Sequence, residues 1–281
     1  MKNKRILITG GAGSIGSEIV RQLSERNKIY ILDINESAIF DIVDEVGQEN
    51  ATGRVGDIRD YKTVKDVFDD FKPQIVFNCA AYKHVPLMEY TPLEAIQTNV
   101  IGHYNLIHVA KTWECVEKFV FVSTDKVVSS RSIMGATKRL GEIITLNQGK
   151  GYIVVRFGNV MGSRGSLLKI WQRQMDKKQP LTVTDRRMER YMMTIPEACN
   201  LVIEACERGQ GGETYVLDMG KKINVMELAE RIVKESRYHG PSGRLAIEET
   251  GMRPGETLSE ELMFEEEKKR ATKEDKFYVI R

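Results

Sequence analysis

Long hydrophobic runs, close cysteine pairs and a strong net charge are all missing from this sequence. No apolar stretch approaches the ~18 residues that a membrane-spanning helix needs, so no membrane span is predicted. The four cysteines form no CxxC pair, and each lies in an apolar or helical context: Cys79, Cys115, Cys199 and Cys206. We expect buried thiols at these positions and no metal site.

The near-zero net charge also excludes whole classes of partner. The 42 basic and 40 acidic residues leave a net charge of +2 and are mixed along the chain. This pattern shows no cluster of positive charge of the kind that binds nucleic acid or an anionic membrane. We therefore expect a small molecule as the partner. With 281 residues, 41% of them hydrophobic, the chain can bury one large core or two modest ones. A short basic leader passes directly into a strand, and we expect a cytoplasmic protein.

Strand-length apolar runs alternate with helical patterns through the first half of the chain. The runs cover residues 5–10, 28–33, 51–57, 74–80, 118–124 and 152–158. They are rich in Val, Ile, Leu and Phe, as is typical of strands that are buried on both faces. Their alternation with helices predicts an α/β fold with a doubly wound parallel sheet of the Rossmann type.

Three glycines stand where the first predicted strand meets the first predicted helix, in "ITGGAGSIGSEIVRQL". Gly10 permits a tight turn, Gly13 lets the backbone approach a pyrophosphate, and the helix start supplies free N–H groups and a favourable dipole. The strand–turn–helix context indicates a dinucleotide site, which a lone glycine trio would not. The candidate cofactor residues in this motif are Gly10, Gly13, Ser14, Ile15 and Gly16.

Asp33 ends the second strand, ~20 residues beyond the glycines, where a carboxylate can accept from a ribose 2′-hydroxyl. The same carboxylate would repel a 2′-phosphate, so NAD is favoured over NADP, although Arg21 and Asn35 nearby argue the other way. Asp57 follows the third strand, and we include it and Ile58 as cofactor candidates. Asp57 could hold the adenine amino group or cap the next helix, and both interpretations stay open.

The strand–helix rhythm changes after residue 157. We predict an NAD-binding Rossmann domain over residues 1–157 and a smaller, interleaved substrate region over residues 158–281. In the second region we expect a helix near 166–178, a helix from Pro196, a strand at 213–218 that can join the main sheet, and a helix from Asn224. The charged run "EEEKKR" (265–270) is expected to be a solvated helix face.

A tyrosine is also missing. A nucleotide-binding chain of this size is expected to carry one four residues before Lys138, because that spacing places phenol and ammonium on one helical face. The residue there is Met134, which cannot transfer a proton and can only pack. Candidate proton-transfer groups remain in Thr124, Asp125 and Lys126, at the C-terminal end of a central strand, where ligands meet a parallel sheet. A turn followed by a helix cap is the structural alternative for this trio.

The glycine spacing, "NCAAY" after the fourth strand, Asn99, "VFVSTD" and Lys138 resemble the extended short-chain dehydrogenase/reductase family. The resemblance becomes more specific over residues 4 to 265, where the chain is similar to the nucleotide-sugar 4,6-dehydratases of bacterial polysaccharide and glycoprotein biosynthesis. Five blocks in the right order carry it: "AAYKHVPLMEYTPLEAIQTNVIG", "FVSTDKVVSSRSIMGATKRLGE", "VRFGNVMGSRGSLLKIWQRQ", "VTDRRMERYMMTIPEACNLVIEA" and "GMRPGETLSEEL".

This resemblance implies dehydration of a UDP-sugar, expected to be UDP-N-acetylglucosamine, with configuration retained at carbon 5. A hydride leaves sugar carbon 4 for NAD, water is lost across carbons 5 and 6, and the hydride returns to carbon 6. Asp125 would be the acid for the carbon-6 hydroxyl, Lys126 the carbon-5 base, and Thr124 a partner of the carbon-4 oxygen. Lys138 would contact the nicotinamide ribose, and Met134 would pack nearby. The carbon-4 proton could leave through Thr124, Lys138, Asp125 or water.

The same resemblance adds ligand contacts outside these motifs. Ala80, Ala81 and Asn99 join the cofactor candidates. Arg190 and Arg253 could grip pyrophosphate oxygens as planar forks, Glu256 could accept from a ribose or hold Arg253, and His84 could equally be a structural histidine. The substrate candidates are Lys83, His84, Asn159, Ser163, Arg190, Arg253 and Glu256.

The family also sets expectations about assembly and about departures from its pattern. We expect a homo-oligomer formed through the helices that follow strands four and five. Many relatives have Asn-Pro after the Thr-Asp-Lys block, where this chain reads "VVSSRSI", so the loop over the sugar is expected to differ. Many also carry an N-terminal membrane portion, and this chain is expected to be the short, soluble form.

Three alternatives stay open on the sequence alone. The first is a 4,6-dehydratase that inverts carbon 5. The second is a sugar-nucleotide epimerase or ketoreductase, in which simple hydride shuttling does not require the Asp125–Lys126 pair. The third is a dinucleotide-binding regulatory protein that lost its activity together with the tyrosine.

Overall fold

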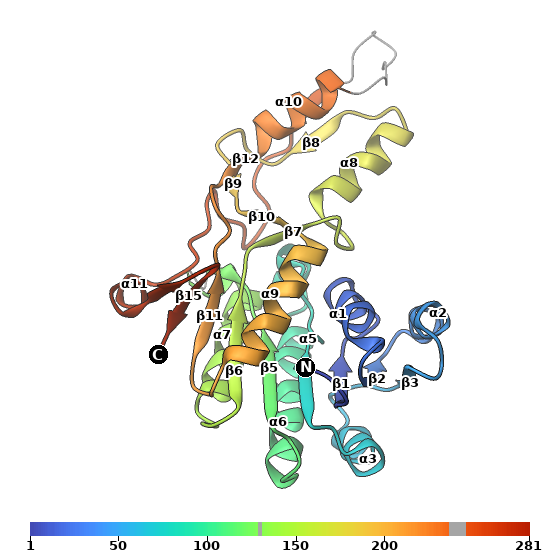
Figure 1. Ribbon diagram of the computed structural model, residues 1–281. Coiled ribbons are helices and arrows are strands. Elements are labelled where there is room, and N and C mark those ends of the chain that lie inside the picture. The colour runs from blue at the N-terminus through green and yellow to red at the C-terminus, as the bar shows by residue number, and fades with distance from the viewer. Residues whose placement is uncertain (129–130, 236–245) are drawn as a thin grey trace.

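The computed structural model describes residues 1–128, 131–235 and 246–281. The strands of its main sheet are β1 (Arg5–Thr9), β2 (Lys28–Asp33), β3 (Ala51–Val55), β4 (Ile75–Asn78), β5 (Lys118–Val122), β6 (Tyr152–Arg156), β11 (Thr214–Leu217), β14 (Thr272–Glu274) and β15 (Phe277–Ile280). Within the described residues they form a nine-stranded sheet in the order β14-β15-β11-β6-β5-β4-β1-β2-β3 (Figure 1). The predicted Rossmann sheet is therefore confirmed.

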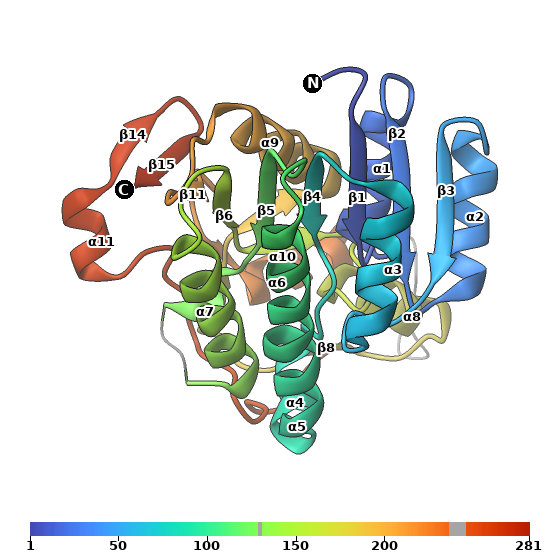
Figure 2. The ribbon, with the colours of Figure 1, turned by 90° about the horizontal axis from the view of Figure 1, so that it is seen from below.

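Strands β3 to β11 pair in parallel across this order, whereas β15 is antiparallel to both β11 and β14. Figure 2 shows β3 at one edge and the β14–β15 hairpin at the other. The chain runs outward from β1 to β3 and then returns to β4 on the other side of β1. Ligands of open α/β sheets bind outside the carboxyl ends of the strands at such a reversal.

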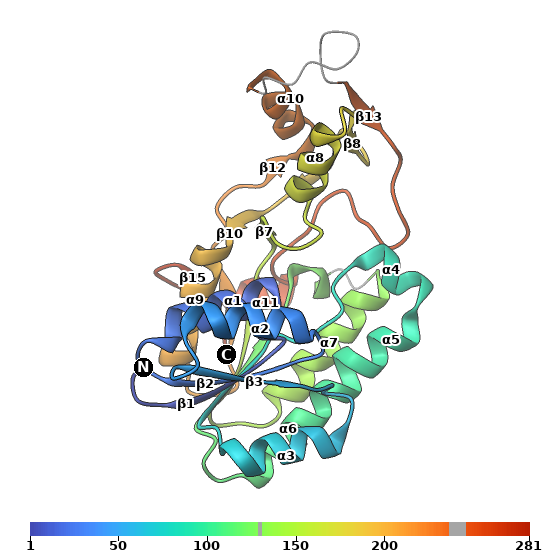
Figure 3. The same cartoon turned by 90° about the vertical axis from the view of Figure 1, so that its right-hand side faces the viewer.

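Helices cover both faces of the main sheet (Figure 3). On one face lie α1 (Ser14–Ser24), α2 (Glu36–Val46) and α9 (Ile195–Arg208), and on the other lie α3 (Tyr61–Phe71), α6 (His103–Thr112) and α7 (Ile133–Leu146). Successive side chains of β1 point to opposite faces of the sheet. Ile6 and Ile8 therefore lie in one hydrophobic core, and Leu7 lies in a second one. Three short elements precede α6, namely α4 (Val85–Tyr90), α5 (Pro92–Ile96) and the π-helix η1 (Gln97–Gly102).

A smaller region follows β6 and appears above the main sheet in Figure 1. Its elements are β7 (Asn159–Met161), α8 (Leu167–Asp176), β8 (Leu181–Val183), β9 (Glu189–Arg190), β10 (Met192–Thr194), β12 (Ile223–Asn224), α10 (Val225–Glu235) and β13 (Ile247–Glu249). Trp171, Leu181 and Val225 are buried in a separate small core. The chain leaves this region to supply α9 and β11 to the main domain and returns to it, so the two parts interleave.

The expected elements are present with shorter bounds. Most of the expected strands end one or two residues earlier than the apolar runs, and the helix expected near 166–178 is α8. The segment after residue 182 has more structure than its polar sequence indicates, because β9 pairs with β12 and β10 pairs with β7. The part of the altered "VVSSRSI" loop at 129–130 lies outside the described residues.

The run expected to be a solvated helix face is exposed except at Glu267. It forms α11 (Glu265–Arg270), but Glu267 is buried and bonded to the fully buried Arg156 of β6 at 2.7 Å. Arg156 also holds Glu142 of α7 at 2.8 Å, and Glu142 accepts from Ser123, next to the end of β5. The C-terminal segment is thus tied to the strand and the helix that carry the proton-transfer candidates.

Glu267→Ala should therefore lower the free energy of unfolding by about 3 kcal/mol, because it removes one partner of a buried ion pair. Glu266→Ala is the matched control: Glu266 is exposed on the same helix, and its loss should change stability by less than about 0.5 kcal/mol. Urea denaturation of both variants measures the difference. Equal small losses would show that the buried triad contributes nothing to stability.

Candidate active site

The glycine motif forms a tight cradle between β1 and α1. Gly10 has φ = 65°, and a Cβ there would lie 2.6 Å from the backbone nitrogen of Ala80. The N–H of Gly13 donates to the Gly10 carbonyl at 2.9 Å, and a Cβ on Gly16 would collide with that same carbonyl. Gly13 caps α1 without any side-chain hydrogen bond, so the first N–H groups of this helix stay available to an anion.

Asp33 reaches the glycine motif from the end of β2. Its Oδ2 accepts from the N–H of Ala12 at 3.0 Å, and its Oδ1 accepts from the N–H of Asn35 at 3.0 Å. The two nearby residues that could favour a phosphate have other partners: the Arg21 side chain is paired with Glu45, and the Asn35 side chain caps α2. The carboxylate therefore stands beside the cradle with no cation bound to it among the described residues.

Asp57 and Ile58 follow β3. Asp57 accepts from the backbone and the side chain of Arg59, at 2.8 and 2.7 Å, and the residue that caps α3 is Asp60. Ile58 is buried against Gly102, so its side chain belongs to the core. The helix-cap interpretation of Asp57 is therefore wrong.

Two buried asparagines shape the loop after β4, which contains Ala80 and Ala81. Asn78 accepts from Thr9 at 2.8 Å and contacts the buried His103 ring at 2.8 Å. Burial first, and then the nearby Lys138, lower the pKa of His103 to about 3, so this ring is neutral at physiological pH. Asn99 lies in η1 and exchanges two hydrogen bonds with the backbone of Tyr82, at 2.9 and 3.0 Å. Its visible role is to hold this loop against α7 rather than to offer a free side chain.

The Thr-Asp-Lys trio is a connected hydrogen-bonded unit at the end of β5. Asp125 is fully buried, and its Oδ1 accepts from the Thr124 hydroxyl at 3.0 Å and from Lys126 Nζ at 2.9 Å. Its Oδ2 is buried without a hydrogen-bond partner. Lys126 also donates to Asn159 at 3.1 Å and remains partly exposed. A hydroxyl, a carboxyl group and an amine are therefore linked in series beside the sheet edge.

Lys138 and Met134 lie one turn apart on α7, behind this trio. Lys138 is buried, donates to the Val122 carbonyl at 2.6 Å and stands over the Phe121 ring. Burial lowers the pKa of Lys138 to about 8, against the opposing influence of Cys79 and Glu142. Met134 is buried in an apolar cluster with Val85, Met88 and Ala95. At the position expected for a tyrosine, the side chain therefore packs in an apolar cluster.

Glu260 is a site residue that the sequence did not single out. It is buried, and its Oε1 lies 3.9 Å from Lys126 Nζ and 3.9 Å from the Arg190 guanidinium. Burial and the neighbouring Asp125 raise the pKa of Glu260, while Lys126 and Arg190 oppose that rise. Nothing in "GETLSEEL" distinguishes it from the exposed Glu261, so only the fold reveals it.

The substrate candidates fall into two groups. Lys83 donates to Ser163 at 3.2 Å, and the ring of His84 packs against Gly165, so the loop after β4 meets the loop after β7. Partial desolvation, followed by Lys83 and Arg253, lowers the pKa of His84.

The second group surrounds Glu256. Arg253 donates to Glu256 at 2.6 Å through its side chain and at 3.0 Å through its backbone. Arg190 is buried and donates to the carbonyls of Glu189, Leu258 and Thr257. Arg190 therefore fixes the 257–258 segment, whereas Arg253 stays exposed.

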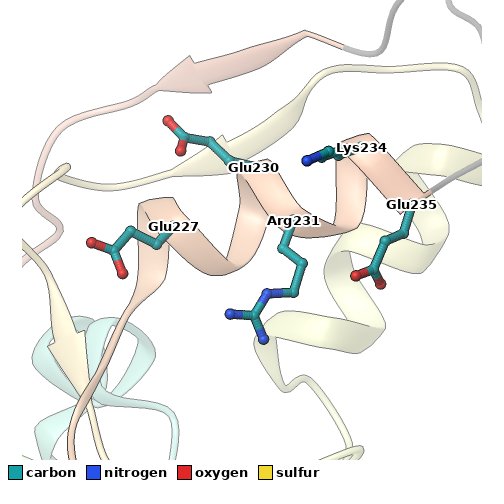
Figure 4. A pocket seen from close by; sticks show the side chains of 5 residues that line it. All are labelled: Glu227, Glu230, Arg231, Lys234 and Glu235. Carbon is teal, nitrogen blue, oxygen red and sulfur yellow. The ribbon is translucent and has the colours of Figure 1, made fainter.

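Other features of the described chain carry no comparable chemistry. A shallow hollow on α10 is lined by side chains of both charges, as Figure 4 shows: Glu227, Glu230, Arg231, Lys234 and Glu235. The described residues contain no group of three or more His, Cys, Asp or Glu side chains placed to hold a metal ion. The cysteines are free, and Cys199 and Cys206 are buried. None of the described helices is long and apolar enough for a membrane crossing.

Solved proteins share this Rossmann-type fold. The chain superimposes with a TM-score of 0.79 on UDP-glucose 4-epimerase from Thermus thermophilus in complex with NAD, at 23% identity, over 92% of this chain and 90% of that one. It matches the family model described as polysaccharide biosynthesis protein over residues 6–281. The chain therefore belongs to the polysaccharide biosynthesis protein family.

Individual relatives support this membership. The chain is 43% identical over 275 residues to the capsular polysaccharide biosynthesis protein CapD of Staphylococcus aureus, covering 94% of this chain but only 45% of CapD. It is 32% identical to a UDP-glucose 4-epimerase of Rickettsia bellii, over 99% of this chain and 83% of that protein. Among solved structures, Pen from Bacillus thuringiensis gives a TM-score of 0.92 at 36% identity, over 99% of this chain and 88% of Pen.

The lowered pKa of Lys138 makes a pH-dependent prediction. In the unfolded chain a lysine keeps its proton to pH ~10.4, whereas native Lys138 loses it near pH 8. Between these values the unfolded state binds more protons, so the buried lysine becomes less destabilising as pH rises. The free energy of unfolding of the wild type, relative to Lys138→Met, should rise by about 1.4 kcal/mol per pH unit in this window.

Urea denaturation at pH 7.0, 8.5 and 9.5 would measure this difference, with Lys111→Met as a surface control that should show no such trend. A difference between the wild type and Lys138→Met that does not change with pH would contradict the burial of a titrating ammonium at this position.

Proposed function

We propose that this protein is a nucleotide-sugar 4,6-dehydratase that converts UDP-N-acetylglucosamine into a UDP-4-keto-6-deoxy sugar with retention at carbon 5. The observation that carries the proposal is the serial hydrogen bonding of Thr124, Asp125 and Lys126 at the C-terminal end of β5. A dehydratase needs an acid and a base at adjacent sugar carbons, and this unit offers both.

The cradle between β1 and α1 fits a dinucleotide. A Cβ at Gly10 or Gly16 would collide with the backbone of Ala80 or with the Gly10 carbonyl, so glycine is needed for this tight turn, and α1 begins with uncapped N–H groups. Asp33 stands where it can accept from a ribose hydroxyl and would repel a 2′-phosphate, so the proposed cofactor is NAD rather than NADP. When bound, the nicotinamide would take a hydride from carbon 4 of the sugar and return it to carbon 6.

The proton transfers that the reaction requires match the hydrogen bonds within the Thr-Asp-Lys trio. Lys126 removes the carbon-5 proton, and Asp125 protonates the departing carbon-6 hydroxyl, which leaves as water. Asp125 must regain the proton that it gives up in each turnover. The carbon-4 hydroxyl must lose a proton when carbon 4 is oxidised. The Thr124 hydroxyl, 3.0 Å from Asp125 Oδ1, supplies a route from the carbon-4 oxygen to that carboxylate. The trio can therefore perform the proton transfer that would be expected of a tyrosine at the position of Met134.

Retention at carbon 5 follows from using one base twice. After water leaves, Lys126 carries the proton that it took from carbon 5 and can return it to the same face of the sugar. Its hydrogen bonds to Asp125 and Asn159 hold Nζ on one side of the site. Inversion would require a different acid on the opposite face of the sugar.

The second region would bind the nucleotide part of the substrate. Lys83, Ser163 and Asn159 stand beside the trio, and the exposed Arg253 is held by Glu256. A guanidinium is suited to bidentate contact with a pyrophosphate. Arg190 supports this surface through the carbonyls of residues 257 and 258.

Epimerisation at carbon 4 is the second candidate, and the epimerase relative that matches nearly the whole chain favours it. An epimerase needs the same oxidation at carbon 4 but no acid for a leaving hydroxyl. The burial of Asp125 in direct contact with Lys126 and Thr124 would then have no chemical purpose.

The direct test is to incubate the purified protein with UDP-N-acetylglucosamine, without added cofactor, and to follow the sugar by mass spectrometry and proton NMR. We expect loss of one water and a new methyl signal. Asp125→Asn and Lys126→Ala should each reduce the rate by about 100-fold or more. A product of unchanged mass with inverted carbon 4 would establish the epimerase instead.

Matched controls exist on α3, where Lys65 and Asp69 form an exposed ion pair at 2.5 Å. Asp69→Asn and Lys65→Ala remove the same chemical groups from a surface helix and should leave the rate unchanged. Comparable losses in the two sets of variants would show that the effect at residues 125 and 126 is not specific to the site.

We further propose that the chain forms a homo-oligomer through the helices that follow β4 and β5. Their outer surfaces expose large apolar side chains: Leu87, Tyr90, Leu93, Ile96, Ile101, Tyr104, Leu140 and Ile143. A second copy would bury this area, which is unusual for a monomer surface. Light scattering of the purified protein measures the assembly mass, and a monomeric mass would contradict the proposal.

A further inference from the structure

Arg164 links two parts of the chain that are distant in sequence. It lies between β7 and α8, yet its backbone N–H donates to the Ser14 hydroxyl at 2.9 Å and its guanidinium donates to the Ala12 carbonyl at 2.6 Å. Both acceptors belong to the glycine motif at the start of α1. The substrate region therefore places a cation directly on the cradle proposed for the dinucleotide.

The loop that carries Arg164 is held from both sides. Gly162 and Gly165 adopt φ values of 77° and 69°, a conformation that favours glycine. Ser163 between them donates to the Val160 carbonyl at 3.0 Å and accepts from Lys83 at 3.2 Å. Gly165 lies so close to the ring of His84 that a Cβ there would collide with it. These contacts fix the direction in which Arg164 leaves the loop.

Arg164 and Lys83 have no acidic partner among the described residues, whereas Lys126 contacts Asp125 at 2.9 Å. Partial desolvation lowers the pKa of Lys83, and the charges of Lys126 and Arg164 lower it further. Three cations therefore share one small region with two carboxylates, Asp125 and Glu260, and both of these carboxylates lie against Lys126. Such an excess of positive charge is expected where anionic ligands bind.

We infer that Arg164 is a cofactor-binding residue that closes over the pyrophosphate of the dinucleotide and slows its release. The inference rests on the proposed function, in which the hydride returns to the same sugar and the cofactor must stay bound throughout. A guanidinium now bonded to a neutral carbonyl would gain a stronger, charge-assisted partner in a phosphate oxygen. The same loop contacts Lys83 through Ser163, so it touches both the cofactor cradle and the substrate side.

The test measures dinucleotide release rather than turnover. The protein is loaded with radiolabelled NAD, chased with excess unlabelled NAD, and filtered at timed intervals. Arg164→Ala should release NAD about 10- to 100-fold faster than the wild type, the range for loss of a hydrogen bond between charged groups. Arg164→Lys should be intermediate, because it keeps the charge but loses the planar fork.

Two controls make the result specific. Arg173→Ala removes an exposed arginine of α8 whose side chain donates to the Lys169 carbonyl, and it should leave the release rate unchanged. Adenosine, which has no phosphate, should bind wild type and Arg164→Ala equally. A parallel loss of adenosine affinity would indicate a distorted cradle and overturn the assignment, as would an unchanged NAD release rate.

Failure of this inference is distinguishable from failure of the proposed dehydratase activity. A protein that retains NAD through Arg164 but leaves UDP-N-acetylglucosamine unchanged would keep the inference and remove the substrate assignment. A wild-type protein that does not bind NAD at all would contradict both.

Discussion

Parallel pairing of β1, β4 and β5 is the constraint on which the rest of the site depends. The register aligns Thr9 with Asn78 and Asn78 with Phe121, so the loops after all three strands leave the same edge of the sheet. The glycine cradle, the loop with Lys83 and His84, and the Thr-Asp-Lys trio are neighbours for that reason alone. Residues far apart in sequence are thereby brought together at one edge of the sheet.

Buried polar contacts then fix the angles at which these loops leave the sheet. Asn78 connects Thr9 to the neutral His103, and Asn99 ties the backbone of Tyr82 to Thr137 of α7. An unpaired polar group in these positions would cost about 1–3 kcal/mol, so each network favours one arrangement of the loops. Rigid loops suit the proposed reaction, in which each proton transfer must occur over a hydrogen-bond distance.

The C-terminal segment extends this support to the opposite side of the site. Arg156 joins Glu142 and Glu267 in the interior, and Glu142 also accepts from Ser123, directly before Thr124. The C-terminal part of the chain also adds β11 and β15 to the sheet and braces the strand that ends in the Thr-Asp-Lys trio.

Local patterns predicted most of the fold. Apolar runs and their spacing located the strands of the parallel sheet, and the glycine motif located the tight turn between β1 and α1, because these features depend on short-range backbone geometry. Features that depend on tertiary contacts were harder to predict from the sequence. Glu260 is buried beside Lys126 while Glu261 is exposed and paired with Lys222, although the two are adjacent and identical. Likewise, nothing local in "GSRGS" indicates that Arg164 contacts Ala12, because that contact spans 152 positions.

The missing tyrosine is a second case in which the local sequence was not enough to predict the contacts. Met134 indicated only that a phenol was absent, and four proton routes remained open on the sequence. In the structure Met134 is buried in a cluster with Val85, Met88 and Ala95, and Thr124 donates to Asp125. This hydrogen bond supports the proposed route, which runs through Thr124 and Asp125.

The most direct measurement of the central claim uses UDP-N-acetylglucosamine labelled with deuterium at carbon 4. A dehydratase that carries out the whole cycle at this one site should transfer the label to the new carbon-6 methyl group of the same molecule, with no exchange into solvent. Label that remains at carbon 4 of an unchanged or epimerised sugar would contradict the account.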